Sequence, residues 1–123
     1  MAFDWQENLR LARSLGVGIA GQTVSISFSE ATERCAVGRA YYAAFCHARM
    51  YAVRHQGFVA SGGAFDHGNL AAHFVTVGMP RVSQRLGQLR SWRNQCDYDD
   101  VVPNLSAKVR TALNYAADVI RLL

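Results

Sequence analysis

The stretch GRAYYAAFCHARMYAV, residues 38–53, forms part of the longest helix that the sequence predicts. On a 3.6-residue period it has two broad, mainly apolar sides, with Tyr42, Phe45, Cys46, Arg49 and Val53 on one and Tyr41, Ala44, Ala48 and Ala52 on the other. Only a narrow sector with His47 and Arg54 is left for solvent. A helix that is apolar over most of its circumference is central, so we expect several neighbouring helices, or such neighbours plus a second subunit, to pack around it.

Apolar periodicity and capping residues predict four further helices around this central one. The central helix opens at Ser27 or Ser29 and runs to about Arg54. The others cover 4–15, about 69–77, about 81–96, and a last segment that Pro103 opens, whose buried face is expected to carry Leu105, Val109, Ala112, Ala116, Val119 and Leu123. The connections at 16–28 and 56–68 are rich in glycine, and the second lacks the G-K-[ST] of a phosphate-binding loop. The predicted fold is all-α, an up-and-down bundle of four main helices plus one short helix, with residues 1–123 as a single domain.

Composition limits the kind of protein but does not select a function. Half of the residues are hydrophobic, and the formal net charge is +4, with Lys108 the sole lysine. Arginine makes forked contacts to carboxylates and phosphates, so a nucleic-acid or nucleotide partner is permitted. The three cysteines are odd in number and far apart, which favours a reducing compartment. With neither a signal peptide nor a membrane span in the sequence, we expect a cytoplasmic protein that does not enter a membrane.

The predicted fourth helix carries an arginine in its apolar stripe. The stripe consists of Val82, Leu86, Leu89, Arg93 and Cys96. A guanidinium that faces the core or an interface needs partners, and Asp97 at i+4 supplies a carboxylate. Arg90, Arg39 and Tyr42 are candidates for the same polar centre. Two interpretations remain open, namely a buried pair that only fixes packing and an anion-binding or RNA-cleaving centre.

Two motifs resemble one known family. GRAYYAAFCHAR at 38–49 is similar to the S-R-A-Y-Y-A-A-F-x-x-A-R signature of HEPN domains (higher eukaryotes and prokaryotes nucleotide-binding), and LRSWRNQCDYDD at 89–100 resembles their L-x-x-x-R-x-x-A-D-Y segment. The opening FDWQENLRLA resembles the first helix of a bacterial subgroup. The resemblance implies a helical bundle that forms a homodimer. Many HEPN proteins are metal-independent ribonucleases, and several are toxins of toxin–antitoxin or defence systems beside a nucleotidyltransferase-like partner or antitoxin.

The resemblance also implies a site. Arg93 matches the family's catalytic arginine and Asn94 the polar residue after it, whereas Tyr98 stands where the family has a histidine. Histidine exchanges protons near neutral pH, but tyrosine, with a pKa of about 10, is a poor base there. Three hypotheses follow: a dimer that binds RNA, a nucleotide or a partner protein near Arg93; an active ribonuclease that uses Arg93, Asn94 and Tyr98; and a purely structural interaction module.

The histidines add little to these hypotheses. His47 either faces a groove as part of the binding centre or is an exposed surface residue. His67 and His73 are six residues apart without a set of cysteines or carboxylates at ligand spacing, and Asp66 beside His67 is a weak sign of a metal site. We therefore expect neither a metal nor another cofactor.

Overall fold

The computed structural model describes residues 30–123, which form four helices and no strand. The helices are α2 (Glu30–His55), α3 (Phe65–Thr76), α4 (Pro80–Tyr98) and α5 (Leu105–Leu122). The predicted all-α helical bundle is confirmed for this part of the chain. The helix predicted at 4–15, the connection at 16–28 and the proposed caps Ser27 and Ser29 lie outside the described residues.

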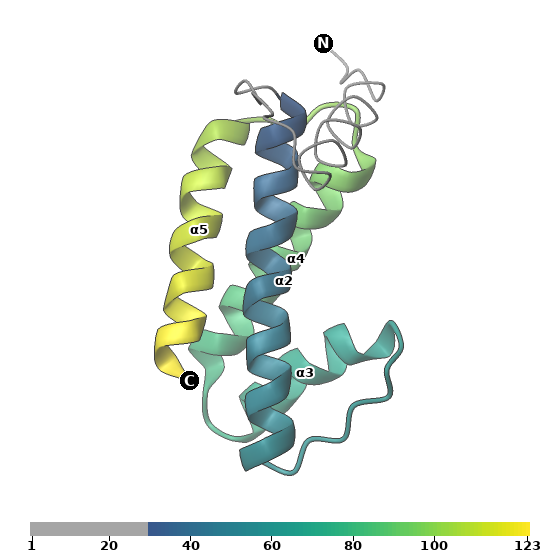
Figure 1. Cartoon of the computed structure of the whole chain (residues 1–123), viewed down its shortest axis with the longest axis vertical. Coiled ribbons are helices and arrows are strands. Elements are labelled where there is room, and N and C mark those ends of the chain that lie inside the picture. Colours follow the sequence, from purple (N-terminus) through teal and green to yellow (C-terminus); the bar gives the residue numbers. More distant parts are fainter. Residues whose placement is uncertain (1–29) are drawn as a thin grey trace, which may run out of the picture.

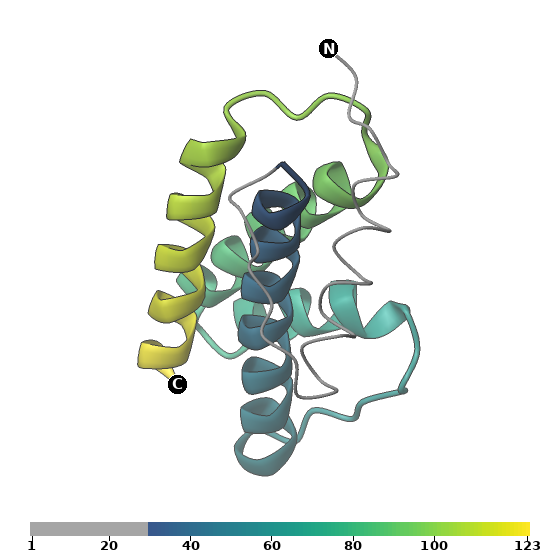
Figure 2. The same ribbon diagram turned by 45° about the horizontal axis from the view of Figure 1, so that its top comes forward.

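Helix α2 is the central element of the bundle (Figure 1). It packs against α5 on one side and against α4 on another, while α3 packs mainly on α4 (Figure 2). Along the long axis α2 and α5 run one way and α4 runs back, so these three helices have the predicted up-and-down arrangement. α3 is the short helix, which crosses beside the lower half of α2.

The side of α2 that faces the core carries mostly alanine. Ala44, Ala48 and Ala52 are fully buried, and Tyr41 and Phe45 are buried beside them. Small side chains let neighbouring helix backbones approach closely, which suits a helix packed on several sides.

Residues 30–123 do not cover the other predicted apolar side of α2. Of the residues assigned to that side, Tyr42, Cys46 and Val53 are exposed, Arg49 is half-buried and only Phe45 is buried, while the neighbouring Met50 is also exposed. We predicted neighbours around nearly the whole of α2. Within residues 30–123, neighbouring helices cover only the side that carries Tyr41, Ala44, Ala48 and Ala52.

Three helix boundaries differ from the prediction, and the first is the start of α5 at Leu105, two residues after Pro103. α3 begins at Phe65, four residues before the predicted start, because Asp66 organises the preceding loop through hydrogen bonds to the backbone of Ser61 and Gly62. α4 starts at Pro80, close to the prediction, and continues to Tyr98 instead of ending at 96. Proline suits the first turn of a helix because the N–H it lacks has no intrahelical partner there.

The apolar stripes predicted for α4 and α5 are confirmed. Val82, Leu86, Leu89 and Cys96 are buried on α4. On α5 the buried residues are Ala112, Ala116 and Val119, while Leu105, Val109 and Leu123 are partly buried. Cys35, Cys46 and Cys96 are all free thiols. Within residues 30–123, no helix has both the length and the apolar character that crossing a membrane requires.

Candidate functional site

Arg93 lies at the edge of the buried face of α4. Its side chain is 20% exposed, and Nε lies 2.8 Å from Oδ2 of Asp97, so the predicted ion pair is present. The N–H of Nε is not aligned with that oxygen as a hydrogen bond requires. Nη1 donates to Oδ1 of Asn94 at 3.2 Å. These two polar partners come from the same helix and leave part of the guanidinium open.

The same guanidinium joins α4 to α2. Cζ of Arg93 lies 5.1 Å from the centre of the Tyr42 ring, a distance at which a cation and an aromatic face attract each other. Tyr42 is 37% exposed, so this contact is at the surface of the bundle. The predicted association of Tyr42, Arg93 and Asp97 is therefore present.

His67 of α3 completes this surface, which the sequence did not predict. Its Nδ1 shares a short hydrogen bond with the hydroxyl of Tyr41, and its ring stacks on Phe45 with the ring centres 4.4 Å apart. Asp66, the preceding residue, accepts hydrogen bonds from Ser61 N (2.8 Å), Ser61 Oγ (2.7 Å) and Gly62 N (2.9 Å). These bonds hold the start of α3 in place, and with it the position of His67.

Arg90 extends the positive charge toward α3. A Cβ placed on Gly68 would lie 4.0 Å from Nη1 of Arg90, so this arginine passes beside the backbone that follows His67. Arg90 makes no ion pair or hydrogen bond with residues 30–123, and it differs in this respect from Arg93. Arg49 of α2 lies on the same surface, with Cζ 5.3 Å from the centre of the Phe45 ring.

The pKa shifts reflect this combination of burial and positive charge. Burial lowers the pKa of His67 below its usual value, and the charges of Arg90 and Arg93 lower it further. Burial raises the pKa of Tyr41 to about 12, although Arg90 and Arg93 act in the opposite direction. His67 therefore favours the neutral imidazole at pH 7, and Tyr41 keeps its proton.

We call this set of residues the arginine cluster. It consists of Tyr41, Tyr42 and Arg49 from α2, His67 from α3, and Arg90 and Arg93 from α4. Guanidinium groups beside aromatic rings and a neutral imidazole can bind an anion and stack on a planar group.

Three predicted site residues are not joined to the cluster. Tyr98 ends α4 with its side chain 72% exposed, and no hydrogen bond or ring contact links it to Arg93 or Asn94. Arg39 is exposed on α2 and makes no ion pair or hydrogen bond with the described residues. His47 is half-buried, so it is not the exposed surface residue of one prediction. It is also not part of the arginine cluster. It lines a separate shallow pocket formed by Met50, Tyr51, Arg54, His55 and Leu123.

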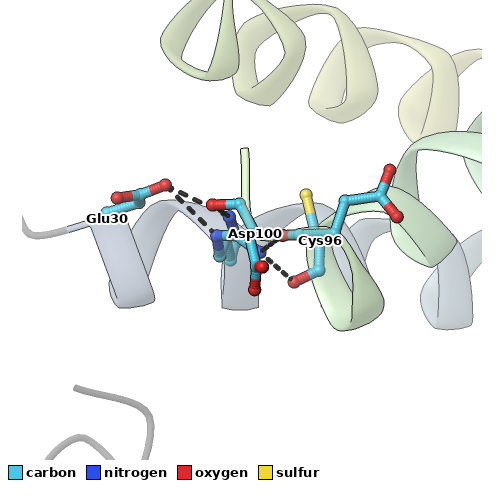
Figure 3. A network of polar contacts seen from close by, with 5 residues as sticks. Glu30, Cys96 and Asp100 are labelled. Atoms are coloured by element: carbon cyan, nitrogen blue, oxygen red, sulfur yellow. Dashed lines mark hydrogen bonds and ion pairs between the residues drawn. The ribbon is translucent and has the colours of Figure 1, made fainter. Parts of the chain in front are cut away.

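A second polar centre, at Arg34, was missed in the sequence. Arg34 is 2% exposed, and Nη1 donates to the carbonyl oxygens of Cys96 (2.8 Å) and Asp99 (2.7 Å). Nη2 donates to the carbonyl of Asp100 (3.2 Å) and pairs with Oε1 of Glu30 (3.2 Å), as Figure 3 shows around the labelled Glu30, Cys96 and Asp100. The sequence pattern that could have identified Arg34 is an arginine in the buried stripe of α2, and the same pattern identified Arg93 on α4.

Residues 30–123 contain no group of three or more histidine, cysteine, aspartate or glutamate side chains that could hold a metal ion. No protein-family model, no curated protein and no solved structure matches the chain. The resemblance to HEPN domains therefore stays a prediction that rests on the two sequence motifs.

Proposed function

We propose that this protein is a HEPN-like, dimeric RNA-binding protein and that the arginine cluster is its binding site. The observation that carries the proposal is the placement of Arg90 and Arg93 beside the partly exposed rings of Tyr42 and His67. Single-stranded RNA is bound by arginines that contact its phosphates and by aromatic rings that stack on its bases. The formal net charge of +4, which is almost all arginine, supports such a partner. A place in a bacterial toxin–antitoxin or defence system rests on the resemblance alone.

The test is RNA binding measured by fluorescence anisotropy with a labelled single-stranded oligonucleotide. Arg90→Ala removes a guanidinium that holds no carboxylate among the described residues, so the variant leaves no unpaired acid behind. We expect about tenfold weaker binding, because a charge-assisted hydrogen bond is worth roughly 1.5 kcal/mol or more. The logarithm of the binding constant should also fall less steeply with the logarithm of the salt concentration, by the amount that about one phosphate contact contributes.

Arg110→Ala is the matched control for this test. Arg110 is exposed on α5, which packs on α2 away from α3, so the variant loses the same charge on another face. An equal loss of RNA affinity in Arg90→Ala and Arg110→Ala would contradict a site at the arginine cluster. The same RNA is run on a denaturing gel after incubation with wild type and Arg93→Ala. Shortening by the wild type alone would establish the ribonuclease alternative.

The proposal of a homodimer is supported by the side of α2 that residues 30–123 leave uncovered. Met50 and Val53 are 45% and 47% exposed, and they continue the stripe that begins at Tyr42 in the arginine cluster. Apolar residues spaced along one helix face are a common self-association surface. We expect light scattering to report a dimer for wild type and a monomer for Met50→Asp. Leu113→Asp, at an exposed apolar position on α5, is expected to stay dimeric. A wild-type monomer at micromolar concentration would contradict the proposed dimer.

A further inference from the structure

His67 has one ring nitrogen that is held and one that is available. The hydroxyl of Tyr41 has no acceptor other than Nδ1 of His67 among the described residues. Because Tyr41 keeps its proton at neutral pH, its O–H donates to Nδ1, and the neutral imidazole then carries its own proton on Nε2. Nε2 makes no hydrogen bond with residues 30–123 and is not sealed from solvent. His67 therefore presents an oriented N–H donor.

The surroundings of this donor carry an excess of positive charge. The groups that face His67 are Tyr41, Tyr42 and Arg49 from α2, Asp66 from α3, and Arg90 and Arg93 from α4. Asp66 is occupied by the backbone and hydroxyl of the loop before it, and Asp97 pairs with Arg93. Three guanidinium groups against these two carboxylates leave one positive charge in excess. An anion that enters the cluster meets Arg90 without a competing carboxylate.

We propose that one phosphate monoester binds to Nε2 of His67 and to the guanidinium groups of Arg90 and Arg93, and that His67 takes up a proton when this group binds. A phosphodiester carries one negative charge, which the excess positive charge already balances. A monoester carries close to two, and a protonated His67 supplies the second positive charge. The proposal rests on the proposed function, because it assigns a ligand to the same cluster. The monoester comes either from a free mononucleotide or from the 5′-phosphorylated end of an RNA.

Proton uptake follows from the groups already present. In the empty cluster, burial and the charges of Arg90 and Arg93 keep His67 neutral. A bound dianion offsets the arginine charges and accepts a hydrogen bond from the imidazolium, and both effects favour the charged form. Binding and protonation then strengthen each other, so the affinity for the monoester rises as the pH falls.

The first experiment is calorimetric binding of uridine 5′-monophosphate between pH 8 and pH 6.5. For wild type we expect roughly tenfold tighter binding at the lower pH, which lies within the limit of about thirtyfold that uptake of one full proton sets over this range. His67→Gln keeps an N–H donor but cannot take up the proton. Its affinity is expected to change by less than about twofold, which reflects only the second ionisation of the ligand near pH 6. Equal pH dependence in wild type and His67→Gln would overturn the proposal.

A second measurement uses the unmodified protein, so it does not depend on how the variant folds. The imidazole Cε1–H signal of His67 is followed by NMR against pH, with and without uridine 5′-monophosphate. We expect the midpoint to move to higher pH with the ligand. A midpoint that stays in place while the ligand binds would overturn proton uptake.

Tetranucleotides distinguish the two sources of the monoester. Tighter binding of 5′-phosphorylated tetrauridine than of both the mononucleotide and the 5′-hydroxyl tetramer indicates an RNA end. Equal binding of the mononucleotide and the phosphorylated tetramer indicates a free nucleotide. If the 5′-hydroxyl tetramer binds as tightly as the phosphorylated one, the monoester assignment is wrong, whereas RNA binding that depends on Arg90 would still support the proposed function.

Discussion

Two arginines lie in the buried stripes of two helices, and the chain uses them differently. Arg34 of α2 is 2% exposed and donates to three backbone carbonyls at and beyond the end of α4. Arg93 of α4 is 20% exposed and finds its two polar partners on its own helix. Both have a carboxylate four residues away, Glu30 for the first and Asp97 for the second.

The two arginines differ in whether a ligand can displace their hydrogen-bond and ion-pair partners. The carbonyls that Arg34 binds belong to the last turn of α4 and to the residues that follow it. Such carbonyls have no partner inside the helix, and the negative end of the helix dipole favours a cation there. Arg34 therefore joins α2 to the end of α4 and has no open face for a ligand. The partners of Arg93 are half exposed or exposed side chains, so an anion can compete with them.

Replacement of Arg34 is expected to have the largest effect on stability. Arg34→Ala leaves the carbonyls of Cys96, Asp99 and Asp100 without this donor, and the free energy of unfolding should fall by about 3 kcal/mol. Urea unfolding followed by circular dichroism measures the loss. Arg110→Ala, at an exposed position of α5, is expected to stay within about 0.5 kcal/mol of wild type. A similarly small change for Arg34→Ala would remove the structural role assigned to it.

Arg93→Ala is expected to lower the free energy of unfolding less than Arg34→Ala does and to weaken RNA binding more. The ion pair with Asp97 and the contact with Tyr42 are partly exposed, so the loss should be about 1 kcal/mol or less in the same urea measurement. RNA affinity in the anisotropy assay should nevertheless fall. If Arg93→Ala destabilises the protein as much as Arg34→Ala and leaves RNA binding unchanged, the two arginines have the same structural role.

The smallest expected effect is a pH dependence of stability at His67. The folded-state pKa of His67 is lowered, so the unfolded chain binds the proton more readily. The free energy of unfolding should therefore fall as the pH drops below about 6.5, the ordinary value for histidine, and on through the lowered folded-state value. Urea unfolding at several pH values between 8 and 5 measures the slope. His67→Gln should have a shallower slope, and an unchanged slope would show that burial and the arginine charges do not lower the pKa of His67 in the folded protein.

Local patterns were sufficient for much of the fold. Apolar residues three and four apart predicted α4 and α5 with their buried faces, and Pro80 marked the start of α4. The Arg93–Asp97 pair was predictable because residues four apart on a helix are neighbours. The early start of α3 was not predictable from periodicity, because it depends on how the carboxylate of Asp66 bonds to the loop before it.

The candidate site was predictable only in part. Tyr42, Arg90, Arg93 and Asp97 were placed in one centre from helix faces alone. His67 was missing, because the pairing with Tyr41 joins residues 26 positions apart on different helices. Arg34 was missed for the same reason, since the carbonyls that it binds lie more than 60 residues further along the chain.

The sequence by itself determined the helical class, the central place of α2 and the presence of an arginine in an apolar stripe, because these depend on spacing within a single helix. Tertiary structure decided which arginine is sealed and which is open. It also brought His67 and Arg90 together on one surface. Burial and hydrogen-bond partners are set by which helices pack against each other, and a pattern within one helix does not contain that information.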